Sequence, residues 1–167
     1  TQHATSEFLA GVIEGFYGKP WTQAERLELF DWMTPWGLNA YLYAPKDDLK
    51  HRALWREAYN PAEAAPLAEL IRVCARRGTA FFYALSPGLD LRYGAEADLD
   101  HLRRRLDQML ELGCPHFALL FDDIPDRLDP EDLRRWGSLA AAQADVVNAL
   151  FRRTRERSPH ARFLFCP

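Results

Sequence analysis

Hydrophobic residues along the chain gather into short continuous runs separated by segments of helical periodicity. Five runs are rich in β-branched and aromatic residues: 8–16, 39–44, 79–85, 116–121 and 162–166. Strands that are buried on both faces of a sheet are apolar throughout, whereas half-buried strands alternate apolar and polar positions. The five runs therefore predict five strands that are covered on both sides.

Signals for helices lie between these runs. Thr22 and Glu25 have the spacing of a capping box, and Gly37 marks the end of the helix that they begin. The inward side of this helix is expected to carry Leu29, Phe30, Met33 and Trp36. Apolar residues recur at helical spacing within 60–78 and 99–113, and a last helical segment starts at Asp129 with a break near Gly137.

Regular alternation of strands and helices predicts an α/β fold with a parallel sheet, either doubly wound or a (β/α)8 TIM barrel. A dinucleotide-binding sheet has G-x-G-x-x-G after its first strand, and Gly11, Gly15 and Gly18 do not fit that spacing. The barrel is therefore preferred. A complete barrel takes about 250 residues. We expect residues 1–167 to form the N-terminal portion of a single barrel domain, with about the first five strands.

Composition narrows the range of partners. The chain is 48% hydrophobic and 27% charged with a net charge of −3, which excludes a disordered protein and leaves no basic excess for nucleic acid. No apolar run approaches the roughly 20 residues of a membrane helix, so no membrane partner is expected. Cys74, Cys114 and Cys166 are too widely spaced for a zinc motif, and they favour a reducing, cytoplasmic location unless a leader has been removed.

Candidate chemistry lies at the carboxyl ends of the predicted strands, where barrels place their reacting groups. Asp122 and Asp123 leave the fourth run, and adjacent carboxyls that are partly buried resist ionising together. One can then remain protonated while the other is ionised, provided that the strand ends or bends between them. A pair of aspartates in an ordinary turn or helix cap is an equally common arrangement.

Two further strand ends carry candidate ligand contacts. Gly15 allows close approach of a ligand to the backbone, and Phe16 and Tyr17 offer faces for stacking on a sugar. Lys46 begins a long charged loop that also contains His51. A solvated loop and aromatic core residues are the simpler interpretations. The arginines at 103–105 are expected to be a solvated helix face, and no spacing of histidines indicates a metal.

Taken together, the strand-end blocks resemble the catalytic domain of glycoside hydrolase family 84, the β-N-acetylglucosaminidases that include the O-GlcNAc hydrolases. The resemblance rests on residues 11–21 (GVIEGFYGKPW), 39–57 (NAYLYAPKDDLKHRALWRE), 84–90 (ALSPGLD), 117–124 (FALLFDDI) and 163–167 (FLFCP). The blocks follow in order over nearly the whole chain. The family has a barrel fold, which agrees with the fold predicted from periodicity.

The resemblance implies a retaining exo-glycosidase without a cofactor, in which the 2-acetamido group of the substrate attacks the anomeric carbon to give an oxazoline. By this analogy Asp122 holds the acetamido N–H, and Asp123 is the general acid and base. Gly15 and Lys46 match sugar-hydroxyl contacts, and Phe16 and Tyr17 match pocket walls. The implied partners are a glycoprotein or another N-acetylglucosamine conjugate and the remaining barrel segment of the same protein.

Two alternatives to this enzyme stay open. One is a catalytically inactive barrel module that binds an N-acetyl sugar. The other is a metal-dependent hydrolase that uses Asp122, Asp123 and His51.

Overall fold

The computed structural model describes residues 8–124 and 127–167 as five strands and the helices between them. The strands are β1 (Gly11–Glu14), β2 (Ala40–Tyr43), β3 (Ala80–Leu85), β4 (His116–Leu120) and β5 (Phe163–Cys166). The helices are α1 (Gln23–Met33), the 3-10 helix η1 (Leu49–His51), α2 (Pro61–Arg76), α3 (Glu96–Glu111), α4 (Pro130–Trp136) and α5 (Leu139–Arg157).

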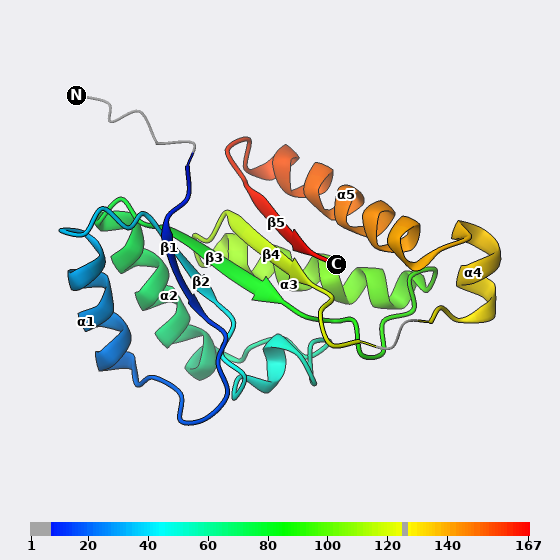
Figure 1. The fold of residues 1–167 in the computed structure, drawn as a ribbon. Coiled ribbons are helices and arrows are strands. Elements are labelled where there is room, and N and C mark those ends of the chain that lie inside the picture. Colours follow the sequence, from blue (N-terminus) through cyan, green and yellow to red (C-terminus); the bar gives the residue numbers. More distant parts are fainter. Residues whose placement is uncertain (1–7, 125–126) are drawn as a thin grey trace.

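The strands form one parallel sheet in the order β1-β2-β3-β4-β5 (Figure 1). Each strand pairs with the next strand in the sequence, as in a barrel, whereas a doubly wound sheet reverses its order near the middle. The described part of the chain is therefore an arc of four consecutive β/α units followed by a fifth strand. This order confirms the choice that was made from the glycine spacing.

The two faces of the sheet have different coverings. Alternate strand residues such as Tyr41, Tyr83 and Phe117 pack with Phe30 of α1 and Leu102 of α3 in the main core. The other strand residues form a separate apolar layer to which the helices contribute no member: Leu42, Ala44, Phe82, Ala84 and Ala118. The helices therefore cover one face, here called the outer face, and the opposite inner face corresponds to a barrel interior.

Local signals explain where the helices begin. Thr22 and Glu25 form the predicted capping box, and Asn60 with Glu63 forms a second one at the start of α2. These reciprocal bonds satisfy backbone N–H groups that have no partner within the helix.

The sequence-based assignment was wrong at two places near the N-terminus. The first strand covers Gly11–Glu14 only, and Trp36, expected to point inward, is 80% exposed. Helix α1 ends at Met33, so Trp36 falls in the turn beyond it and not on the inward side of the helix. In the part of the chain that the structure describes, no helix has the length and apolar character to cross a membrane.

Candidate active site

The strand ends that carry the candidate residues meet at one edge of the sheet. The registers pair Glu14 with Tyr43, Tyr43 with Tyr83, and Leu85 with Leu119, so the ends of the first four strands lie side by side. Side chains alternate between the two faces of a strand. The last inner-face positions at the ends of β2, β3 and β4 are Ala44, Ala84 and Leu120, and Lys46, Ser86 and Asp122 follow two residues later in the loops beyond them. Gly15 follows directly on β1 at the same edge.

Asp122 and Asp123 lie in a turn directly after β4. The turn begins at Phe121, which is buried and whose N–H donates to the Cys166 carbonyl at 2.9 Å. Asp122 is half-buried, whereas Asp123 is exposed and has a φ of +55°, in the left-handed region. In a straight strand the two carboxyls would point to opposite faces, and the turn removes that constraint. The bend expected between the two aspartates is therefore present.

The segment after β1 brings a second set of candidates to the same edge. The ring of Phe16 packs edge-on against Trp21 with centroids 5.0 Å apart. The Lys46 ammonium lies 5.4 Å from the centroid of the Tyr17 ring, so the loops after β1 and β2 touch one another. Tyr17 is 75% exposed, which leaves its ring available to a ligand. The predicted sugar contacts thus form one cluster on adjacent loops.

The loop after β2 is pinned to the end of β3 by His51. This histidine is fully buried, its Nδ1 lies 2.8 Å from the Ala84 carbonyl, and its own carbonyl accepts the Ser86 N–H at 2.9 Å. Burial lowers the pKa of His51, so the imidazole is neutral with the proton on Nδ1. The next residue, Arg52, donates from Nη2 to the Asp123 carbonyl at 3.1 Å.

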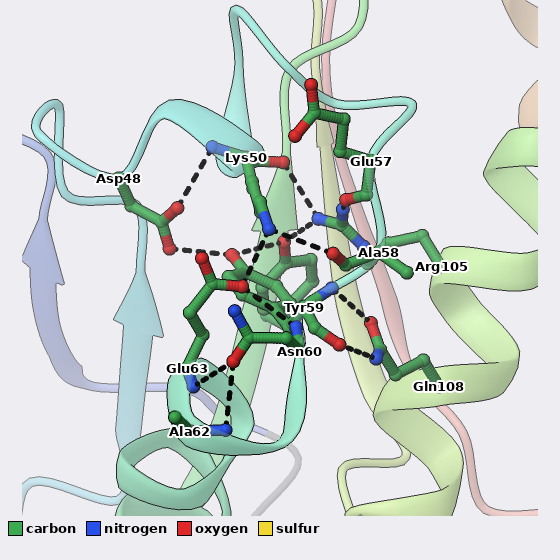
Figure 2. A network of polar contacts seen from close by, with 11 residues as sticks. Asp48, Lys50, Glu57, Ala58, Tyr59, Asn60, Ala62, Glu63, Arg105 and Gln108 are labelled. Carbon is green, nitrogen blue, oxygen red and sulfur yellow. Dashed lines mark hydrogen bonds and ion pairs between the residues drawn. The ribbon is translucent and has the colours of Figure 1, made fainter.

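A polar network on the outer side supports the same loop (Figure 2). Asp48 accepts from the Tyr43 hydroxyl at 3.0 Å and from the Tyr59 hydroxyl at 2.6 Å. The Tyr59 hydroxyl lies 2.9 Å from that of Tyr83, which accepts a 2.6 Å bond from Arg105. Arg105 also donates to two loop carbonyls, so helix α3 holds the loop through its backbone.

A cavity of about 560 Å³ adjoins this network and includes Tyr43, Asp48, Lys50, Tyr59 and Glu63 in its lining. Its central polar groups are bonded to each other, since Lys50 pairs with Glu63 at 2.6 Å and Asp48 receives both tyrosine hydroxyls. A ligand site presents polar groups that are free to bind the ligand. The candidate site is therefore the inner edge of the sheet and not this cavity.

Sequence reasoning missed three charged residues that shape the edge. Arg105, which was expected on a solvated face, is 2% exposed. Arg52 was noted only as a member of the long charged loop after the second strand and was given no role. Glu14 is buried at the end of β1, where it accepts from the Arg26 guanidinium of α1 at 2.7 Å and from the Tyr41 hydroxyl. The signal for Glu14 was its place two residues after Val12, on the outer side of β1.

The metal-dependent alternative gains nothing from the geometry. Among residues 8–124 and 127–167, no three His, Cys, Asp or Glu side chains are grouped as metal ligands. His51 directs Nδ1 to a backbone carbonyl and does not join Asp122 and Asp123 in such a group.

Comparisons with known proteins find relatives over nearly the whole length of this chain. The beta-N-acetylglucosaminidase family model matches residues 10–167. Protein O-GlcNAcase of Rattus norvegicus and that of Mus musculus are each 46% identical over 160 residues, which are 96% of this chain and 17% of the relative. An O-GlcNAc hydrolase structure from Thermobaculum terrenum superposes with a TM-score of 0.91 at 41% identity, over 95% of this chain and 35% of that chain.

A second solved structure, CpGH84B, gives a TM-score of 0.81 at 33% identity, over 94% of this chain and 26% of that chain. The chain thus spans 17% of the length of the rodent relatives and about a third or less of the two solved structures. The likeness nevertheless extends over nearly every residue that is present. From the family match over residues 10–167 and the 46% identity to the rodent proteins, the chain belongs to the beta-N-acetylglucosaminidase family.

Proposed function

We propose that the complete protein is a retaining exo-β-N-acetylglucosaminidase that acts through an oxazoline intermediate, with residues 1–167 as the N-terminal portion of its single (β/α)8 catalytic domain. The observation that carries the proposal is the Asp122–Asp123 turn at the carboxyl edge of the sheet. Two adjacent carboxyls on the side of a barrel where its chemistry occurs can divide the work of orienting a nucleophile and moving a proton.

In the first step the acetamido oxygen of the substrate bonds to the anomeric carbon as the bond to the leaving oxygen breaks. Asp122 accepts a hydrogen bond from the acetamido N–H, which orients the amide and stabilises the positive charge that develops on it. Asp123 donates its proton to the departing oxygen. In the second step the Asp123 carboxylate removes a proton from water, which attacks the anomeric carbon and restores the acetamide. General acid–base assistance of this kind contributes about 10²–10⁴-fold in rate.

The cluster after β1 and β2 supplies the sugar contacts in this proposal. Lys46 donates to a sugar hydroxyl, and the Gly15 backbone approaches the ring without a side chain in between. Phe16 and Tyr17 form a pocket wall, supported by the exposure of the Tyr17 ring. The remaining contacts come from barrel strands outside this chain.

The substrate class is a β-linked N-acetylglucosamine conjugate, and O-glycosylated protein is favoured because the similar rodent proteins are named O-GlcNAcases. An inactive sugar-binding module is the alternative. The adjacent carboxyls weigh against it, since binding alone does not require a proton donor.

The test uses the complete protein and aryl β-N-acetylglucosaminides whose leaving groups differ in acidity. Asp123→Asn is expected to lower kcat/KM most for a poor leaving group such as phenol, because a dinitrophenolate departs without a proton. Asp122→Asn is expected to lower it for both substrates. Fluorination of the N-acetyl group is expected to slow the wild-type enzyme, since it weakens the attacking oxygen. Binding of N-acetylglucosamine without turnover would favour the inactive module instead.

A further inference from the structure

Arg52 joins two loops that carry the proposed chemistry. It follows η1 in the loop after β2, and its Nη2 donates to the backbone carbonyl of Asp123 at 3.1 Å. The two residues are 71 positions apart in the sequence. The bond therefore crosses from the end of β2 to the end of β4, past the end of β3.

The backbone that carries Arg52 is held in place by the residue before it. The preceding residue, His51, is held by its side chain at the Ala84 carbonyl and by its backbone at the Ser86 N–H. A side chain attached next to such an anchor loses little further freedom when it binds. The guanidinium is thus presented to the Asp123 peptide by the end of β3 and not by a free loop.

The Asp123 peptide needs such support. Its φ of +55° lies in the left-handed region, which aspartate adopts more readily than most residues but which is still less favourable than the ordinary conformations. The Arg52 guanidinium is a charged donor, and its bond to the Asp123 carbonyl favours this backbone conformation over the alternatives. The Nη1 nitrogen of the same guanidinium is buried and has no partner among the described residues, so the Asp123 carbonyl is the contact that the structure shows for this end of the side chain.

We propose that Arg52 is a positioning residue for Asp123: it holds the left-handed peptide so that the carboxyl faces the departing oxygen. This inference rests on the proposed function, since it requires Asp123 to be the general acid. Arg52 itself touches neither the substrate nor the proton. Its loss acts on proton donation and leaves the acetamido attack intact.

The test compares Arg52→Met with Arg52→Lys in the complete protein, using phenyl and dinitrophenyl β-N-acetylglucosaminides. Misplacing a catalytic group by about 1 Å can cost up to roughly 10²-fold. Arg52→Met is therefore expected to lower kcat/KM for the phenyl substrate by about 10–10²-fold, and for the dinitrophenyl substrate by less than about 3-fold. Arg52→Lys keeps one donor and is expected to recover much of the phenyl activity.

Arg56→Met is the matched control, because Arg56 lies on the same loop but pairs with Asp90 and Asp98, away from the aspartate pair. It is expected to lower thermal stability and to change both substrates by the same factor. Equal losses on both substrates in Arg52→Met, or the graded pattern in Arg56→Met, would overturn the proposal. If Arg52→Met does not fold, a phenyl-selective loss in Arg52→Lys decides in its favour and an equal loss decides against it.

Measuring Asp123→Asn alongside distinguishes a failure of the proposed function from a failure of the positioning role. If Asp123→Asn shows no dependence on the leaving group, the proposed function itself has failed. If it shows that dependence and the Arg52 variants do not, only the positioning role has failed.

Discussion

Replacing Arg105 by methionine is expected to release the loop that carries Lys46 and Arg52. The guanidinium of Arg105 is buried on the outer side of the sheet. It donates to the Lys50 carbonyl at 2.8 Å, to the Tyr83 hydroxyl at 2.6 Å, and to the Glu57 carbonyl. The methionine has a similar length and fills part of the space, but it donates to none of these oxygens.

The magnitude follows from what the substitution leaves unpaired. Each buried acceptor without a donor costs about 1–3 kcal/mol. Arg105 also lies 4.5 Å from the Tyr59 ring centroid, a cation–π contact worth about 0.5–2 kcal/mol. Loop carbonyls regain water when the loop opens, and removal of a buried charge recovers its desolvation cost. The net loss of local stability is therefore placed at about 3–5 kcal/mol, the lower part of the range that the contacts allow.

Hydrogen exchange in the complete protein measures this loss directly. A local loss of about 3 kcal/mol accelerates exchange of the loop amides by roughly 10²-fold. The Lys50 amide, which donates to Asp48 at 3.0 Å, is one reporter. Arg105→Lys keeps the charge and is expected to give an intermediate effect. Unchanged loop protection in Arg105→Met would refute the assignment of Arg105 as the clamp of this loop.

Three further predictions concern the sheet. Burial and the nearby charge of Arg162 lower the pKa of His116 from 6.5 to about 4, so the stability that depends on neutral His116 is complete above pH 6.5 and is lost as the pH falls toward 4; the protection factors of the β5 amides, which correct for the slower intrinsic exchange in acid, should fall on acidification, and the same fall in His116→Gln would contradict this. Gly11→Ala places a methyl 1.8 Å from the Ala40 carbonyl oxygen and should lower the free energy of unfolding by about 3 kcal/mol, measured by thermal melting. The Gly15→Ala protein should have the melting temperature of the wild type. Burial raises the pKa of the Cys114 thiol to about 12, so native protein should resist alkylation there, and rapid labelling would show that the site opens.

The strand order could be predicted because this sequence marks its strands clearly. Runs such as residues 79–85 and 116–121 are apolar at successive positions, which only a sheet covered on both faces requires. Gly78 and Gly113 adopt positive φ directly after the caps of α2 and α3. Gly37 also has a positive φ, but it was wrong as a helix end, because α1 stops at Met33 and Gly37 closes the turn that follows. The prediction that Trp36 points inward was wrong because helical periodicity does not by itself show where a helix stops.

The supporting arginines were harder to find, and Arg105 shows why. It stands three residues after Leu102 and four before Met109, so it falls on the buried stripe of α3. Its neighbours Arg103 and Arg104 made the segment resemble a solvated face. The position of Arg105 along the helix predicted burial, whereas its residue type predicted exposure to solvent. Arg52 left no such signal, because its partner is a backbone carbonyl 71 residues away.

The polar groups of this fold are divided between the two faces of the sheet. Asp48, Tyr59 and Arg105 lie on the helix-covered side, where each is bonded to another protein group. Asp122 and Lys46 lie in turns beyond the carboxyl ends of β4 and β2, and they are among the groups proposed to meet the sugar. Substitutions on the outer side should therefore lower stability, whereas Asp122→Asn and Lys46→Met should lower activity on every substrate without unfolding the protein, and only changes that act on Asp123 should discriminate between leaving groups. Arg52 connects the two sets, because its loop is held on the outer side while its side chain binds the Asp123 carbonyl. Its variants show whether the stability of the Asp123 turn and the efficiency of proton donation change together or separately.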